Sequence, residues 1–428
     1  SVRLGTTSVF ELLSICGRLA VRRKLSGVMM PLVFSFIPLV ARGGPCTQIS
    51  SCQTIKTPGN YCLAADLVPQ QPNQTCLYIH DAPGVRLDCQ NHTIQGDASA
   101  GQIPAIWIDN SPAFTLQNCT VNLAHPGGTA PVQISNSGSG PTGNFSYIQR
   151  LTVLGGGLMV NNSGGLTIAY NSFSNGVNIL GGSQYSILFN NITIAPDSQT
   201  LAPGGVYFGQ PTKESIIWGN RIDGGWNGQP QWKGADGGVI IQGFSDGWIG
   251  YNQIKNVLGC GTESVGLLER STIIGNTYSG NIGTGALCGW YWSSLKNNEI
   301  AFNRLAADPT ALSAAPPLLN YRWTSSTYIP SPDPTAAKSQ IFWSNNNIHD
   351  NVATRNGAYT YDLYVDLSMA PPQNLTAVNN RMANNNLGRP STGFNFGVLT
   401  PAKAFVDGGG NVCQLIWMQP DYPLFCNP

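Results

Sequence analysis

A hexad of apolar and polar positions is written six times between residues 168 and 305. Each copy has an aliphatic residue first, Asn fourth and an apolar residue sixth, and successive copies are 19 to 32 residues apart. The copies IAYNSF, ILFNNI, IWGNRI, IGYNQI, IIGNTY and IAFNRL begin at Ile168, Ile187, Ile217, Ile249, Ile273 and Ile300. Self-similarity at such a period is typical of solenoids.

A second apolar segment lies about ten residues upstream of most hexads. GLMVNN, GVNILG, GVYFGQ and GVIIQG begin at Gly157, Gly176, Gly205 and Gly238. Alternation of apolar and polar residues within them predicts strands with one buried face. Each repeat therefore predicts a coil of strand, turn, strand, Asn corner and short strand, and a single coil cannot bury its apolar face without neighbours.

The Asn of the hexad has a structural explanation. Asn tolerates left-handed backbone geometry, so we expect it at the sharp bend between two strands. Stacked coils then place successive Asn side chains above one another, where each can bond its neighbour.

These coils resemble the right-handed parallel β-helix, the fold of pectate lyases and related secreted proteins. GVRLDCQNHTIQG (84–96) and FTLQNCTV (114–121) are similar to the first full coils of the broad β-helix-repeat family. The similarity extends from about Gly59 to Val412. The expected fold is all-β, a single right-handed parallel β-helix of roughly eleven coils with disulfide-rich N- and C-terminal caps.

Composition agrees with this expectation and divides the chain. Charged residues make up only 10% of the sequence, and the 50 Gly residues indicate many turns. The segment 22–44 has a basic start, a short apolar run and small residues near its end, which is typical of a secretory signal. We expect upstream residues and a signal peptide over 1–43, a Cys-rich cap over 44–80, the β-helix over 81–412 and a second cap over 413–428.

Cysteine and charge counts point to an extracellular protein. Ten cysteines follow residue 43, an even number that suggests disulfides in an oxidising compartment. Favoured pairs are Cys89–Cys119, Cys260–Cys288 and Cys413–Cys426. Residues 44–428 carry 16 basic and 20 acidic residues, a net charge of −4, so a nucleic-acid partner is not expected. No membrane association is expected after signal cleavage.

Candidate binding residues lie on the outward face of the upstream strands and on two long insertions. Alternation places Tyr207 and Gln242 on that face. The insertion 223–238 carries Trp226 and Trp232, and the insertion 306–340 carries Arg322 and Trp323. Exposed aromatic residues suit the faces of sugars, so the expected partner is an extracellular polysaccharide. The alternative is that these Trp residues pack locally over coil edges.

Candidate catalytic residues are Asp362, Tyr364 and Asp366 in YDLYVDLS (361–368), together with Arg322. Elimination from a uronic-acid polysaccharide needs a base and a cation to neutralise the uronate; Lys233, Lys255 and Arg270 are further candidates for the cation. Ca²⁺ is a possible cofactor, held by Glu263, Glu269, Asp362 or Asp366.

A lyase is favoured over a glycoside hydrolase, because Asp362 and Asp366 would lie about 13 Å apart between Cα atoms on one strand. The polygalacturonase pattern and the pectate-lyase Arg-x-Pro-x-x-Arg pattern are absent from the sequence. The alternative is a non-catalytic extracellular β-helix that binds carbohydrate or serves as a structural protein.

Overall fold

The computed structural model describes part of the chain, and the contacts divide it into Ser1–Cys46 and Thr47–Pro428. Of the first unit only 45 and 46 are described, so the predicted signal segment lies outside the described residues. The described residues of the second unit are 47–71, 74–96, 103–123, 130–139, 145–194, 204–225, 235, 237–257, 259–281, 284–289, 294–307, 324–329, 341–354, 363–366, 375–378, 380–383, 385, 396–399, 405–407, 410 and 416–418.

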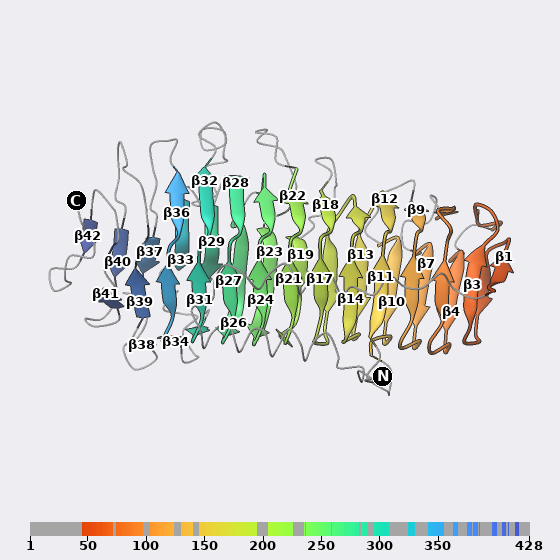
Figure 1. Ribbon diagram of the computed structural model, residues 1–428, viewed down its shortest axis with the longest axis horizontal. Helices are drawn as coiled ribbons and strands as arrows, with labels where there is room; N and C mark the ends of the chain where they lie inside the picture. Colours follow the sequence, from red (N-terminus) through yellow and green to blue (C-terminus); the bar gives the residue numbers. More distant parts are fainter. Residues whose placement is uncertain are drawn as a thin grey trace, which may run out of the picture. The chain divides into compact units, whose positions relative to one another are not determined.

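Every ladder between the described strands is parallel, and the strands form three sheets (Figure 1). Sheet A contains β1(Thr47–Ile49), β3(Asn60–Leu63), β5(Arg86–Asp88), β8(Thr115–Gln117), β11(Ser146–Gln149), β14(Leu166–Ala169), β17(Ser186–Leu188), β21(Ile216–Trp218), β24(Trp248–Gly250), β27(Thr272–Ile274), β31(Glu299–Ala301), β35(Asn347–His349), β39(Asn380–Ala383) and β41(Phe405–Asp407).

Sheet B is formed by the upstream strands. It contains β2(Gln53–Ile55), β4(Leu77–His80), β7(Ile106–Asp109), β10(Val132–Ser135), β13(Leu158–Asn161), β16(Val177–Leu180), β19(Gly204–Phe208), β20(Thr212–Lys213), β23(Gly237–Ser245), β26(Thr262–Glu269), β29(Thr284–Gly289), β30(Ser294–Lys296), β33(Thr324–Ile329), β34(Ile341–Ser344), β37(Leu363–Asp366), β38(Leu375–Val378), β40(Phe396–Leu399) and β42(Ile416–Met418). Beyond β26 it continues along two lines, one through β29 and one through β30.

Sheet C is formed by the short strands after the Asn corner. It contains β6(Thr93–Gln95), β9(Thr120–Asn122), β12(Thr152–Leu154), β15(Ser172–Phe173), β18(Asn191–Thr193), β22(Arg221–Asp223), β25(Gln253–Lys255), β28(Thr277–Asn281), β32(Arg304–Ala307) and β36(Val352–Thr354). A coil thus passes through sheets B, A and C in turn, for example β16, β17 and β18. Parallel crossovers are almost always right-handed, and the fold is the expected right-handed parallel β-helix.

The hexad joins two of these sheets. Its first residue lies in sheet A and its sixth in sheet C, and both are buried, as Ile168 and Phe173 show. In register, the first residues stack as a column of isoleucines from Ile168 to Ile300. The apolar periodicity of the sequence is therefore the core of the coil stack.

The Asn between these residues forms a continuous ladder. The side-chain Oδ1 of Asn190 accepts hydrogen bonds from the backbone N (3.0 Å) and Nδ2 (2.9 Å) of Asn171 in the preceding coil. The same pair of bonds recurs along Asn171, Asn190, Asn220, Asn252, Asn276, Asn303, Asn351 and Asn385.

One part of the expectation for this Asn is wrong. The left-handed residue at the corner is the one before it, for example Tyr170 (φ 59°), Phe189 (φ 52°) and Gly219 (φ 66°). The ladder Asn residues are not left-handed, because their role is to bond the neighbouring coil with a buried amide rather than to relieve backbone strain.

A second ladder, which the sequence analysis missed, lies at the corner between sheets B and A. Ser111, Ser137 and Ser163 each follow a left-handed residue, and the side chain of each accepts a hydrogen bond from the backbone of the preceding coil. Further along the chain the same position is held by Ser271 and then by Asn298, Asn346 and Asn380. Both corners thus satisfy backbone donors that the tight turn would leave unpaired.

Two disulfides lie among the first coils. Cys89–Cys119 is present as predicted, and Cys52–Cys76 forms a further bond. Cys46, Cys62 and Cys260 are also disulfide-bonded, and the predicted pairing of Cys260 with Cys288 stays a prediction. Cys413 and Cys426 lie outside the described residues. The structure shows no membrane-spanning helix among the residues that it describes.

Candidate functional site

One row of side chains crosses the outward face of sheet B, with one residue from each strand. It consists, in register, of Tyr78, Trp107, Gln133, Met159, Asn178, Tyr207, Ile240 and Glu263. We call it the sheet-B row. All but Ile240 are half-buried, and their neighbours in each strand point into the core. The strand alternation thus presents a continuous line of aromatic, neutral polar and methionine side chains from Tyr78 to Tyr207.

The N-terminal end of the sheet-B row is aromatic. The ring of Tyr78 lies 4.9 Å from that of Trp107 and is stacked 5.2 Å from that of His80. Nε2 of His80 is 2.7 Å from an oxygen of Asp81, and its Nδ1 is 3.5 Å from an oxygen of Asp109. Burial, then the Asp109 and Asp81 carboxylates, raise the pKa of Tyr78, so its hydroxyl stays protonated and can donate a hydrogen bond.

Two predicted binding residues meet further along. Nε2 of Gln242 donates a hydrogen bond of 2.8 Å to the hydroxyl of Tyr207. Gln242 is exposed and lies two residues beyond Ile240, the partner of Tyr207 in register. The structure therefore places both residues on the predicted face and in direct contact.

The predicted catalytic residues are described only in part. Tyr364 and Asp366 lie on β37, and Tyr364 pairs with Tyr328 of β33. Since Glu263 pairs with Cys288 and Cys288 with Tyr328, the backbone register of the sheet-B row leads to Tyr364. It lies five strands beyond Tyr207, about 24 Å at the usual strand spacing, so these two residues form no compact site. Asp362, Arg322, Trp323, Trp226 and Trp232 lie outside the described residues.

Two of the candidate cations take part in ion pairs instead. Nζ of Lys255 lies 2.9 Å from Asp223, and the Arg270 guanidinium lies 2.7 Å from Asp246 and 2.8 Å from Glu269. The described part of the chain contains no cluster of three or more His, Cys, Asp or Glu side chains that could hold a metal ion. Calcium binding therefore stays a prediction.

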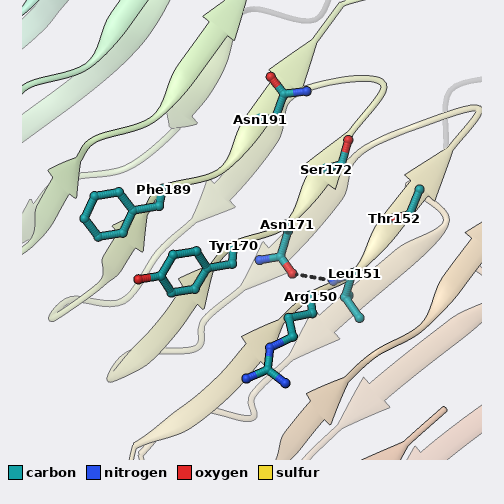
Figure 2. Close-up of a pocket in the computed structure, with 8 residues that line it drawn as sticks. All are labelled: Arg150, Leu151, Thr152, Tyr170, Asn171, Ser172, Phe189 and Asn191. Atoms are coloured by element: carbon teal, nitrogen blue, oxygen red, sulfur yellow. Dashed lines mark hydrogen bonds between the residues drawn. The ribbon is translucent and has the colours of Figure 1, made fainter. Parts of the chain in front are cut away.

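A second surface, which the sequence analysis missed, lies at the corner between sheets A and C (Figure 2). A shallow depression of about 420 Å³ is lined there by Arg150, Tyr170 and Phe189 on one side and by Thr152, Ser172 and Asn191 of sheet C on the other. The signal was present in the hexads, whose third position is Tyr, Phe or Gly in every copy.

Comparison with known proteins gives similarity to solved structures only. No family model and no curated protein matches the chain. PfbA, a surface adhesin of Streptococcus pneumoniae, is 11% identical with a TM-score of 0.39, covering 84% of this chain and 81% of its own. The Dettilon tailspike protein is 12% identical with a TM-score of 0.35, covering 72% of this chain and 61% of its own.

A third similar structure is the GH136 lacto-N-biosidase from Eubacterium ramulus, 11% identical with a TM-score of 0.29 over 84% of this chain and 63% of its own. The match thus spans less than two thirds of the tailspike and of the lacto-N-biosidase. Similarity at this level carries no inference about ligand or activity. The chain's own ladders identify it as a parallel β-helix protein.

Proposed function

We propose that the protein binds polysaccharide outside the cell, with the sugar chain lying along the sheet-B row. The observation that carries this proposal is the continuity of the row: an aromatic pair at Tyr78 and Trp107, then Gln133, Met159 and Asn178, then Tyr207 bonded to Gln242. No residue between Tyr78 and Tyr207 in this row is charged.

The chemistry of the row suits sugars. A pyranose ring presents apolar C–H faces and hydroxyl groups at its edge, so it needs flat apolar surface and neutral hydrogen-bonding groups side by side. Trp107 and Tyr78 provide the surface, and the amides of Gln133, Asn178 and Gln242 provide the bonds. Disulfide bonds at Cys52–Cys76 and Cys89–Cys119 support secretion, since such bonds persist in oxidising compartments.

Binding can be tested with a panel of neutral and acidic polysaccharides by affinity electrophoresis, followed by isothermal titration calorimetry. Trp107→Ala and Tyr207→Ala should weaken the binding of a polymer that the unaltered chain retains, about tenfold each. Tyr147→Ala is the matched control, because Tyr147 is a half-buried outward tyrosine of sheet A. Unchanged binding by both sheet-B variants, or no binding to any polymer, would contradict the proposal.

Eliminative cleavage of a uronic-acid polysaccharide is the second candidate function. It is supported by the register, which continues the sheet-B row to Tyr364 with Asp366 two residues further on the same strand. In this reaction a base removes the proton beside the uronate carboxylate, the C–O bond to the leaving sugar breaks, and an unsaturated uronate remains. Arg322 or Ca²⁺ would neutralise the carboxylate, and Asp362 belongs to the same predicted group.

The unsaturated product absorbs in the ultraviolet, so absorbance during incubation with polygalacturonate or alginate, with and without Ca²⁺, reports elimination directly. A rise that Tyr364→Phe, Asp366→Asn or Arg322→Gln abolishes would support a lyase with these residues. A flat trace from folded protein that still binds the polymer would leave the non-catalytic alternative, a carbohydrate-binding or structural β-helix.

A further inference from the structure

A column of left-handed residues runs along the corner between sheets A and C. From Arg150 onward its members precede the ladder asparagines or their equivalent, and all have φ between 52° and 66°: Arg150, Tyr170, Phe189, Gly219, Tyr251, Gly275, Phe302 and Asp350. Gly adopts this conformation at little cost, whereas bulky residues rarely adopt it. The corner therefore accepts Gly at two coils, yet holds aromatic rings in strained backbone at four others.

Packing explains part of this choice. The ring of Phe189 lies against Gly219, so close that a Cβ added to Gly219 would stand 2.5 Å from the ring. The ring of Tyr251 lies against Gly275 in the same way. These rings cover the backbone of the next coil. However, Tyr170, Tyr251 and Phe302 remain 46%, 45% and 48% exposed, which is more than a covering role requires. Strained, exposed rings are a feature typical of functional sites.

The rings occur in stacked, tilted or edge-to-face pairs. Tyr170 and Phe189 are 5.4 Å apart and nearly parallel, with 14° between their planes (Figure 2). Trp218, one residue before Gly219, lies 4.6 Å from Tyr251, and Phe302 lies 5.5 Å from His349. Together with Arg150 these six residues of the corner (Arg150, Tyr170, Phe189, Trp218, Tyr251 and Phe302) are called the corner stripe.

A row of hydrogen-bonding side chains borders the corner stripe on sheet C. In register it consists of Thr152, Ser172, Asn191, Arg221, Gln253, Thr277 and Arg304. The row contains no carboxylate, and every member except the half-buried Ser172 is exposed. Figure 2 shows its first three members along the strands beside the Tyr170 and Phe189 rings.

Arginines recur along this surface at a fixed interval. Arg150, Arg221 and Arg304 are each three coils apart, about 14 Å at the usual strand spacing. All three are exposed, and within the described ranges none forms an ion pair. Lys255 and Arg270, by contrast, are neutralised by carboxylates. Among the described residues, the surface therefore has positive charge beside its rings that no ion pair neutralises.

We propose that the corner stripe and the bordering row on sheet C form a binding site for an acidic polysaccharide. The rings contact the apolar faces of the sugars, Thr152, Ser172, Asn191 and Gln253 bond hydroxyl groups, and the three arginines bind carboxylate or sulfate groups of the polymer. A nucleic-acid strand is a poorer match, since it carries a charge roughly every 3.4 Å, about four times as dense as these arginines. The site lies on other strands than the sheet-B row and does not depend on it.

The test uses two triple variants of the full chain. Tyr170→Asn, Tyr251→Asn and Phe302→Asn remove the exposed rings with a residue that tolerates the left-handed conformation, so folding is retained. Arg150→Gln, Arg221→Gln and Arg304→Gln remove the charge. Binding of polygalacturonate, dextran sulfate, unmodified dextran and oligo-dT is measured by calorimetry, and circular dichroism melting checks the fold.

The expected result is binding of polygalacturonate or dextran sulfate, weakened about tenfold or more by each triple variant, with melting temperatures close to that of the unaltered chain. Preference between these two polymers identifies the anionic group as carboxylate or sulfate. Tyr147→Ala, on sheet A and outside both the corner stripe and the sheet-B row, should leave this binding unchanged. Three results would overturn the proposal. Dextran could bind as tightly as the acidic polymers, or oligo-dT could bind more tightly than they do. In the third, both acidic polymers bind and neither triple variant alters their binding.

Discussion

Asn190 and Asn220 lie at the same corner of successive coils, and each bond between them has a buried donor and acceptor. Oδ1 of Asn220 accepts from the backbone N and from Nδ2 of Asn190, both at 2.9 Å. Nδ2 of Asn190 also donates to the carbonyl of Ile168 in the preceding coil at 2.9 Å. One amide thus connects three coils, and its loss would leave polar groups of two neighbours unpaired.

The first prediction follows from these bonds. Asn190→Ala should lower the free energy of unfolding by about 2 to 4 kcal/mol, because each buried group left unsatisfied costs about 1 to 3 kcal/mol. The adjacent Asn191, which is exposed on sheet C, provides the matched control. Asn191→Ala should change stability by less than about 0.5 kcal/mol. Urea unfolding followed by circular dichroism measures both, and equal losses for the two variants would exclude the ladder as the cause.

The second prediction concerns the residue before the ladder. Gly219→Ala should lower stability by about 1 to 2 kcal/mol from the left-handed backbone alone (φ 66°). The new methyl group would also displace the ring of Phe189. Gly219→Asn tests the backbone contribution, because Asn tolerates the left-handed conformation better than Ala. Although Asn is larger than Ala, the Asn variant should therefore lose less stability than the Ala variant. Thermal melting distinguishes the variants, and an Ala variant as stable as the original chain would contradict the strain.

The corners between sheets A and C show which features of the coil could be predicted from the sequence. The spacing of Ile168 and Phe173 around Asn171 identified the coil, because the core requires an apolar residue on each side of the corner in every repeat. The pattern could not identify the left-handed residue, since both Asn171 and Tyr170 were compatible with a bend and Asn is the more usual choice. The aromatic corner was missed for this reason.

The placement of two candidate residues agrees with the structure for a related reason. Strand alternation determines which face a side chain occupies, so Tyr207 and Gln242 were placed correctly. Alternation does not determine how many strands lie between two residues on the same face. It therefore could not show that Tyr207 and Tyr364 lie far apart along the coil stack. The serine ladder was missed because Ser111, Ser137 and Ser163 are ordinary turn residues until register aligns them.

The third prediction concerns the disulfide Cys89–Cys119. Cys119 and Leu151 directly precede β9 and β12, as Asn171 precedes β15, so the bond ties adjacent coils where the Asn ladder has not begun. Its loop spans 30 residues. Replacing both cysteines with Ala should cost about 3 to 4 kcal/mol of unfolding free energy. The Asn ladder should keep β14 to β18 intact in this variant. Backbone amide hydrogen exchange should therefore become faster in 86–122 and remain slow in 166–193. An equal increase in both segments would contradict a local role of the disulfide.

The fourth prediction concerns pH and His349. Its Nε2 lies 3.1 Å from Glu299 and its Nδ1 lies 2.6 Å from Asp350, and the side chain is only 15% exposed. The hydrogen bond to Glu299 and then that to Asp350 raise the pKa of His349 above its usual 6.5, despite the opposing effect of burial. The protonated ring thus bridges β31 and β35.

The pKa of His349 is higher in the folded protein than in the unfolded chain. Its contribution to stability is therefore complete below about pH 6.5 and is lost as the pH rises through the pKa of the folded protein. His349→Gln should therefore lower the melting temperature at about pH 5 and have a smaller effect at about pH 9. Melting curves across this range for both proteins measure the difference. Burial opposes the shift at Asp223, but hydrogen bonds from Lys255, Asn256 and Gly225 lower its pKa, and Arg270 lowers that of Asp246. These carboxylates therefore stabilise the fold less at acid pH, equally in both proteins, and their effect cancels in the comparison. A pH-independent difference would show that His349 acts through packing against Phe302 and not through its charge.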